Sequence, residues 1–205
     1  SRALRDHPDI SQSTKQKVRD LAVAMEYEPN SYAVQLRTKQ SNILGILVPS
    51  VDNFFYDSCI ASVEEEAKKH GYIVLIMQSR DHAAVENENL LLFRKNRVCG
   101  LFAAISIETT DFSFFGKLAE ADIPVVFFDR VPELKGVNKV CQPDKVAATI
   151  AAEHIIQKNK KNVLALFGHP KLSITKKRQQ AFKETFRKKD KDAKLVMEYT
   201  ENIAE

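Results

Sequence analysis

The feature that most constrains this chain is a series of apolar runs of strand length, separated by segments with helical spacing. The runs are ILGILV (43–48), YIVLIM (72–77), VCGLFAAI (98–105), PVVFF (124–128) and NVLALFG (162–168). Strands without apolar/polar alternation are buried on both faces, which is typical of a parallel sheet between two layers of helices. Shorter or terminal strands are expected over 137–141 and 194–199. The sequence therefore predicts a doubly wound α/β fold.

Helices are expected between these strands, over 54–70, 83–96, 111–121, 144–158 and 174–189. Residues 1–29 have a different pattern. DHPD interrupts an initial helical stretch, because the residue before a proline avoids the helical region. Ser11 or Ser13 then caps a helix with a single apolar stripe, which Pro29 ends. This small all-α segment cannot fold alone.

The loops after the first four strands carry the polar side chains that point to a binding site. They contain Asp52, Asn53, Phe54, Phe55, Arg80, Asp81, Asp129 and Arg130. Ligands of parallel sheets bind beyond the carboxyl ends of the strands. Aromatic faces with carboxylate, amide and guanidinium groups suit a polar small molecule with apolar ring faces, such as a sugar or a nucleobase. The alternative is that Phe54 and Phe55 only pack the start of a helix on the core.

The sequence contains no arrangement that predicts an enzyme. GxSxG, HExxH, GxGxxG and GxxxxGK[ST] motifs are absent, so no nucleophile elbow, zinc helix or phosphate loop is expected. His154 has apolar helix neighbours, and His169 follows a strand without an obvious partner. Asp81 and His82 form an acid–base pair in sequence, but nothing nucleophilic lies nearby. We expect no catalytic residues, no metal and no cofactor.

Charge is unevenly distributed along the chain. The formal net charge is +4, but residues 156–194 hold thirteen Lys and Arg against three acidic residues. This basic segment is interpreted as a solvated helix face, with nucleic-acid binding as the alternative. Three widely spaced cysteines, no signal sequence and no long apolar stretch predict a cytoplasmic protein without membrane contact.

Several motifs resemble the lactose-repressor (LacI/GalR) family of bacterial transcription regulators. The matches are SRAL (1–4), YEPN (27–30), Ala33, Leu36, Arg37, ILG (43–45) through Pro49, DNFF (52–55), IPVVFFDR (123–130) and KRQQAF (177–182). The resemblance covers nearly the whole chain and implies a periplasmic-binding-protein-like core. It also implies that the chain begins inside the recognition helix and stops within the second core subdomain. The expected segments are a partial helix-turn-helix headpiece (1–29), a hinge helix and linker (30–41), a first core subdomain (42–160) and part of a second (161–205).

The resemblance further implies two sets of site residues. Operator DNA would contact Ser1, Arg2, Asn30, Ala33, Leu36 and Arg37, with Leu36 as an apolar wedge in the minor groove of a homodimer's site. A small-molecule effector would contact Asp52, Phe54, Phe55, Asp129 and Arg178. A helix of about nine residues is unstable alone in water, so the hinge should order only on DNA. The alternative for Leu36 is packing on the core.

Two other functions remain open at this point. A solute-binding protein without a DNA role has the same core fold, but such a protein predicts a signal peptide and no hinge motif. An α/β enzyme would need a reactive group in the loops over 49–57 or 129–135, and none is visible. The leading hypothesis is a transcriptional regulator, a repressor, whose operator affinity is controlled by a sugar-like effector.

Overall fold

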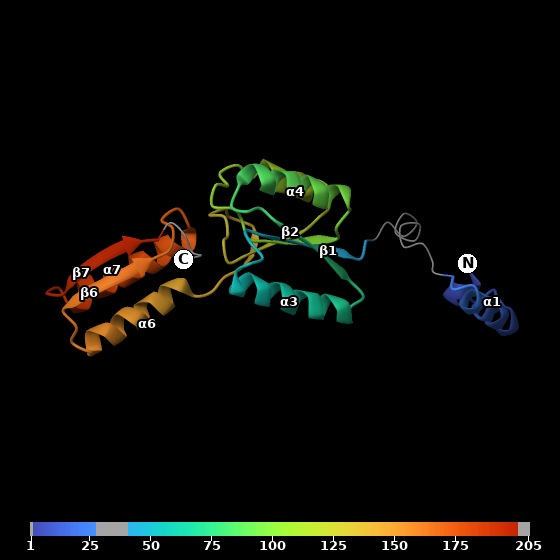
Figure 1. The fold of residues 1–205 in the computed structure, drawn as a ribbon, viewed down its shortest axis with the longest axis horizontal. Coiled ribbons are helices and arrows are strands. Elements are labelled where there is room, and N and C mark those ends of the chain that lie inside the picture. Colours follow the sequence, from blue (N-terminus) through green and yellow to red (C-terminus); the bar gives the residue numbers. More distant parts are fainter. Residues whose placement is uncertain (1, 28–40, 201–205) are drawn as a thin grey trace. The chain divides into compact units, whose positions relative to one another are not determined.

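The computed structural model describes residues 2–27 and 41–200, and the chain divides into two compact units, Ser1–Ser41 and Asn42–Glu205 (Figure 1). The first unit contains a short 3-10 helix, η1 (Ala3–Arg5), and α1 (Gln12–Ala24). Ser11 caps α1 by accepting a hydrogen bond from the Thr14 N–H at 3.3 Å, as predicted. Lys15 is buried and pairs with Asp6 at 3.1 Å. This ion pair ties α1 to the chain that precedes it.

The predicted extension of this helix to Pro29 is wrong. α1 ends at Ala24, and Glu26 adopts a left-handed φ of 48°. The Tyr27 N–H then donates to the Ala22 carbonyl at 2.8 Å, which closes the helix end with a backbone hydrogen bond. The backbone therefore leaves the helical path before it reaches the proline.

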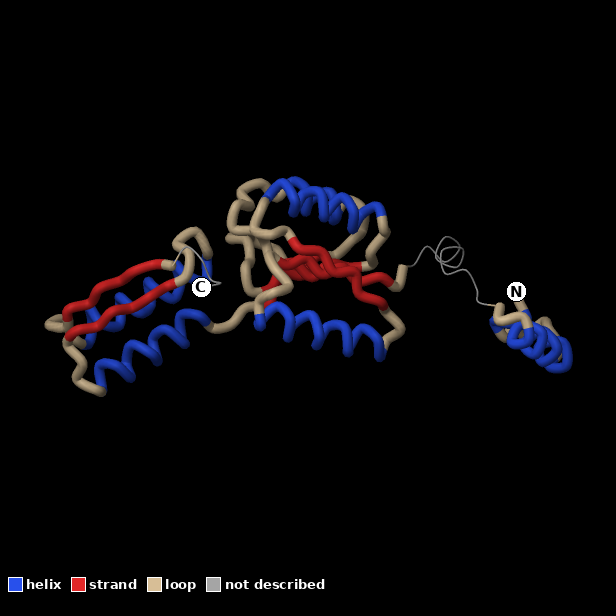
Figure 2. Tube along the Cα trace, viewed as in Figure 1, coloured by secondary structure: helices blue, strands red, loops and turns tan. Residues whose placement is uncertain are grey.

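Five parallel strands form the main sheet of the second unit, in the order β2-β1-β3-β4-β5. Their bounds are Ile43–Val48 (β1), Ile73–Gln78 (β2), Gly100–Ala103 (β3), Val125–Phe128 (β4) and Asn138–Val140 (β5). α3 (Phe54–Lys69) covers one face, while α4 (Ala83–Lys95) covers the other together with α5 (Ser113–Ala119) (Figures 1 and 2). The predicted doubly wound α/β architecture is confirmed, and the sheet directs the carboxyl ends of all its strands to one edge.

The two faces of this sheet hold separate apolar cores. The core under α4 and α5 includes Leu47, Leu90, Phe93, Leu101, Leu118 and Phe127. The core under α3 includes Ile46, Val48, Tyr56, Ile60 and Ala104. In β1, a Cβ on Gly45 would lie 2.9 Å from the ring of Phe93, so only glycine fits beside that ring. The rigid packing on both faces fixes the loops at the strand ends.

The second subdomain is built from α6 (Asp144–Gln157), β6 (Asn162–Phe167), α7 (Ser173–Lys189) and β7 (Lys194–Tyr199). β6 and β7 are parallel, and α6 packs on α7. The predicted subdomain boundary at residue 160 therefore assigns α6 to the wrong side. Ala148 and Ala152 of α6 share a core with Phe182 and Phe186 of α7, so the boundary lies in the segment 141–143. Below, the first subdomain means β1–β5 with α3–α5, and the second means α6–β7.

Candidate functional site

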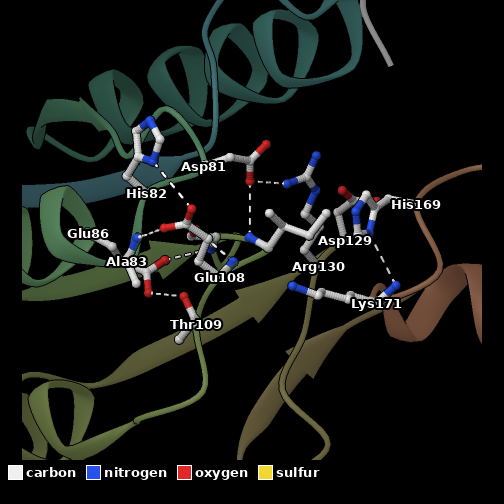
Figure 3. Close-up of polar contacts among 12 residues, drawn as sticks. Asp81, His82, Ala83, Glu86, Glu108, Thr109, Asp129, Arg130, His169 and Lys171 are labelled. Atoms are coloured by element: carbon white, nitrogen blue, oxygen red, sulfur yellow. Dashed lines mark hydrogen bonds and ion pairs between the residues drawn. The ribbon is translucent and has the colours of Figure 1, made fainter. Parts of the chain in front are cut away.

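The loops that follow β2, β3 and β4 meet at the carboxyl edge of the main sheet, and carboxylates link them to one another (Figure 3). Asp81, after β2, accepts a hydrogen bond from the Ile107 N–H at 3.1 Å, in the loop after β3. The same carboxylate pairs with Arg130, in the loop after β4. One side chain thus joins the loops of three strands. We call this group of loops the strand-end cluster.

Two glutamates fix the loop after β3 from both of its sides. Glu86 of α4 is fully buried and accepts hydrogen bonds from the Ser106 N–H at 2.6 Å and the Thr109 hydroxyl at 2.5 Å. Glu108, in the loop itself, accepts from the Ala83 N–H at 3.1 Å at the start of α4. The pKa of Glu108 is lowered chiefly by this backbone hydrogen bond, with smaller contributions from His82 and Lys171. Hydrogen bonds therefore anchor the loop to α4 through both glutamates.

Arg130 is the buried cation of the strand-end cluster. Its residue is 8% exposed, and its guanidinium pairs with Asp81 while its carbonyl accepts from the Ile105 N–H at 3.0 Å. A buried charge without a partner is strongly destabilising, so Asp81 is required to compensate this guanidinium. Arg130 and Asp81 act together as a cross-link under the site.

Asp129 occupies the position directly after β4. One of its carboxylate oxygens accepts a hydrogen bond from the Tyr56 hydroxyl at 2.7 Å. Burial, and next the charge of Asp129, raise the pKa of Tyr56, so this phenol stays protonated and donates. Within the described residues the other oxygen, Oδ1, accepts no hydrogen bond, and the residue is partly exposed. Asp129 is thus held in place with one acceptor open to a ligand.

The backbone at these strand ends is unusual. Arg80, Asp81 and Asp129 have left-handed φ values of 52°, 61° and 53°. Such conformations are costly for residues with a side chain, although aspartate tolerates them better than most, and they concentrate at functional sites. The left-handed turns orient both aspartates where the loops converge.

The second subdomain brings two further side chains to this edge. His169 and Lys171 follow β6, and Figure 3 shows them beside Asp129 and Arg130. The Lys171 N–H donates to His169 Nδ1 at 3.2 Å, and the Ser173 hydroxyl donates to the Val131 carbonyl at 3.3 Å. The candidate site therefore lies at the junction of the two subdomains. From the sequence, His169 had no visible partner.

The predicted effector residues fall into three places. Phe54, the first residue of α3, is 86% exposed, and Asp52 is exposed in the preceding loop. Phe55 contacts Tyr56 edge to face, with ring centroids 5.5 Å apart, and is thereby connected to Asp129. Arg178 of α7 donates to the buried Asp144 at 2.8 Å. Among the described residues, Arg178 contacts none of the other four predicted ligands.

The predicted DNA-binding residues are largely beyond what the structure describes. Arg2 is exposed at the start of η1. The others, namely Ser1, Asn30, Ala33, Leu36 and Arg37, lie outside the described residues.

Sequence reasoning missed several residues that build the site. Tyr56 was hidden within a helix pattern, and Glu86 was one acidic residue among several on α4. The adjacent pair Asp129-Arg130 was visible as a polar loop, but nothing in the sequence showed that Asp81 would pair with the arginine. The Tyr56–Asp129 and Asp81–Arg130 contacts join residues 73 and 49 positions apart, so only the sheet order brings them together.

Other features of the described residues do not compete with this site. A hollow of about 560 Å³ lies at the opposite, amino-terminal edge of the sheet, lined by Leu44, Gly100, Pro124 and neighbours under α3. The described residues contain no group of three His, Cys, Asp or Glu side chains placed to hold a metal ion. In that same part of the chain, no helix combines the length and apolarity that a membrane span requires.

The buried carboxylate of Glu86 gives a pH-dependence prediction. Burial raises its pKa, so the folded state binds a proton more tightly than the unfolded chain does. Its contribution to stability is present below the unfolded pKa, near 4.3, and is lost as pH rises through the raised folded value. Glu86→Gln keeps an acceptor for the Ser106 N–H without the charge. We expect the variant to gain stability relative to wild type as the pH rises from 4 to 7, because only the wild type then buries a charged carboxylate.

Urea unfolding at pH 4 and at pH 7, followed by circular dichroism, measures the difference in the free energy of unfolding between the variant and wild type. Glu88→Gln, a change of the same kind on the same helix, is the control. If the difference in the free energy of unfolding between wild type and Glu86→Gln does not change with pH, the raised pKa of Glu86 is contradicted.

Comparison with known proteins identifies the family of this fold. Residues 41–204 match the model described as periplasmic binding proteins and sugar binding domain of LacI family. The ribose operon repressor of Bacillus subtilis is 26% identical over 196 residues, which cover 96% of this chain and 58% of that protein. The chain thus spans little more than half the length of the curated relatives it matches.

Solved structures share the fold. The Cra transcriptional dual regulator from Pseudomonas putida, in complex with fructose 1-phosphate, aligns with a TM-score of 0.72 at 24% identity, over 79% of this chain and 59% of that one. The lac repressor dimer bound to operator and an anti-inducer aligns with a TM-score of 0.81 at 19% identity, over 97% and 59%. None of these three proteins is named as an enzyme. On the match over residues 41–204, the chain belongs to the family of periplasmic binding proteins and LacI-family sugar-binding domains.

Proposed function

We propose that this chain is part of a transcriptional regulator, a repressor, whose affinity for operator DNA is controlled by a small-molecule effector, a sugar or sugar derivative. The effector binds at the junction of the two subdomains, over the strand-end cluster. The chain is cytoplasmic, acts as a homodimer and has no catalytic role. The observation that carries the proposal is the prearranged set of polar groups at that junction, with Asp129 held by Tyr56 and one acceptor left open.

The chemistry of the junction supports a sugar-like ligand. Hydroxyl groups of a sugar donate to carboxylates, and Asp129 offers a fixed one. The apolar C–H face of a sugar ring suits an aromatic surface, and Phe54 presents its ring 86% exposed. His169 and Lys171 add donors from the opposite subdomain. The ribose operon repressor and the complex of Cra with fructose 1-phosphate agree with this class of ligand.

The first 41 residues support the DNA-binding part. The alignment with the ribose operon repressor covers 196 residues and so extends well into the segment before the sugar-binding domain. We propose residues 1–29 as a helix-turn-helix headpiece, with Ser1 and Arg2 at the operator, and residues 30–41 as the hinge. In the hinge, Asn30, Ala33, Leu36 and Arg37 face DNA.

Coupling between the two sites follows from the position of the effector. A ligand that contacts both subdomains favours one angle between them, and the hinge of each protomer leads directly into β1. If operator DNA favours a different angle, effector and operator affinities are linked and each changes the other by the same factor. The effector's contacts that depend on this angle are those with His169, Lys171 and Arg178 of the second subdomain and with Asp129 of the first.

The experiment that tests the proposal has two parts. Thermal unfolding of the intact gene product is measured with D-ribose and with fructose 1-phosphate, and its DNA targets are mapped by footprinting on genomic DNA. Stabilisation by a sugar together with sugar-dependent footprints supports the proposal. Stabilisation without any footprint supports a solute-binding protein, and footprints that no sugar of a wider panel alters contradict effector control.

The proposed wedge residue allows a direct prediction. Leu36→Ala is expected to weaken operator binding by about tenfold or more, because a methyl group cannot unstack base steps as the larger side chain does. Leu36→Met retains an apolar wedge and is expected to keep most of the affinity. Titration of labelled operator checks both variants, and their melting temperatures should match wild type. Equal operator affinity of wild type and the alanine variant would remove Leu36 from the DNA interface.

A further inference from the structure

A second hollow lies away from the strand-end cluster, between α7 and β7 in the second subdomain. Its volume is about 480 Å³, and it is lined by Lys183, Phe186, Arg187, Asp190, Lys191, Ala193, Leu195 and Met197. Phe186 is buried, and Leu195 and Met197 are half-buried. The floor is therefore apolar, whereas the rim carries three cations and one acidic residue, Asp190.

The rim cations differ from their neighbours in having no acidic partner. Lys161 pairs with Asp190 at 2.8 Å and Lys189 pairs with Glu153 at 2.5 Å. By contrast, Lys183, Arg187 and Lys191 form no ion pair with any described residue. Positive side chains in the last turn of a helix offset its dipole, and Arg187, Lys188 and Lys189 already lie there. Lys183 and Lys191 of the rim thus add positive charge to that of the last helical turn.

The backbone beside this hollow is an open sheet edge. In the described part of the chain β7 pairs only with β6. The N–H groups of Lys194 and Thr200 donate toward β6, to Lys161 and Phe167. Because direction alternates along a strand, Leu195, Met197 and Tyr199 direct their N–H and C=O groups to the open side. An exposed edge of this kind is a template for another strand.

The spacing of the cations matches an extended peptide. Lys183 and Arg187 lie four residues apart on α7, which corresponds to about 6 Å along the helix axis, and Lys191 follows in the turn after the helix ends at Lys189. Every second residue of a strand advances by roughly 6.6 Å and points to the same face. Alternate side chains of a strand added to β7 would therefore match the spacing of Lys183 and Arg187.

We propose that this hollow and the open edge of β7 bind an extended acidic segment of a partner protein. The segment adds as a strand to β7, and its backbone bonds to Leu195, Met197 and Tyr199. Acidic side chains on its α7-facing side pair with the rim cations, and one apolar side chain between them fills the floor at Phe186. The inference is independent of the effector site, which lies at the opposite end of β6.

Nucleic acid is the other polyanion that a basic surface attracts. The apolar floor and the unpaired strand backbone argue against it, since phosphate contacts need neither. A short acidic strand uses both features. The two partners also differ in a measurable way, because backbone pairing is abolished by N-methylation of a peptide.

The test uses the full chain and a fluorescein-labelled eight-residue peptide in which glutamate alternates with serine except for one central leucine on the glutamate face. Fluorescence anisotropy measures binding. A second peptide of the same sequence carries N-methyl groups on alternate residues of its pairing edge, and a labelled DNA duplex is the third probe. We expect the first peptide to bind at least tenfold more tightly than the N-methylated one. Equal binding of the two peptides would overturn strand addition.

Charge-reversal variants locate the site. The double change Lys183→Glu and Arg187→Glu is expected to weaken binding of the first peptide at least tenfold. The matched control, Lys176→Glu with Lys188→Glu, changes the net charge equally on the same helix without altering the rim. Equal losses in both variants, or binding of DNA but not of the peptide, would overturn the proposal.

Discussion

Replacing Asp81 by alanine is expected to lower the free energy of unfolding of the core by about 3–5 kcal/mol. The change leaves the guanidinium of Arg130, whose side chain is 9% exposed, without its carboxylate. It also removes the acceptor of the Ile107 N–H. A buried unpaired cation dominates this cost, because desolvation of the guanidinium is no longer compensated. Urea unfolding followed by circular dichroism measures the effect, since the chain has no tryptophan.

Backbone strain has to be separated from this electrostatic effect. Asp81 has a φ of 61°, so alanine there also adopts an unfavourable left-handed conformation. Asp122 has a φ of 55° and is exposed, so Asp122→Ala measures the backbone contribution alone, about 1–2 kcal/mol. Asp81→Asn keeps an acceptor for Ile107 and Arg130 and should cost less than Asp81→Ala. Equal destabilisation by Asp81→Ala and Asp122→Ala would show that the ion pair contributes nothing.

The sheet was predictable because its strands are apolar on both faces. A run such as ILGILV has no solvent face, so it can only be an interior strand of a layered fold, and β1 lies at Ile43–Val48 as expected. The left-handed turn at Gly71 after α3 could also be predicted, since a glycine commonly follows the end of a helix. The corresponding turn after α1 uses Glu26, so the sequence carried no such signal.

Assignment of α6 failed for a different reason. Its apolar residues, such as Ala148 and Ala152, specify that one face is buried but not against which sheet. Likewise, Tyr56 is read as a core residue from its spacing, and only the order of β1, β3 and β4 places its hydroxyl on Asp129. The local sequence pattern therefore predicted the helices, the strands and the sheet edge at which a site forms. Which side chains contact one another at that edge could be known only from the order of the strands.

Arg178→Ala is expected to abolish the stabilisation that a bound sugar provides. If D-ribose or fructose 1-phosphate stabilises the wild-type protein, a concentration of 100 times Kd adds about 2.7 kcal/mol to the free energy of unfolding. Arg178 is partly exposed on α7, with its Nε bonded to Asp144 and its remaining donors available to a hydroxyl or phosphate. Loss of those donors should remove most of the ligand-induced shift.

The ion pair of Arg178 requires a readout that does not depend on baseline stability. Asp144 is 7% exposed, so Arg178→Ala leaves a buried carboxylate without its cationic partner and lowers the free energy of unfolding even without ligand. Asp144→Asn breaks the same pair but leaves the guanidinium in place. We therefore expect both variants to be less stable than wild type, and only Asp144→Asn to retain the ligand-induced shift. An undiminished shift in Arg178→Ala would remove this arginine from the site, because its loss would then affect folding and not binding.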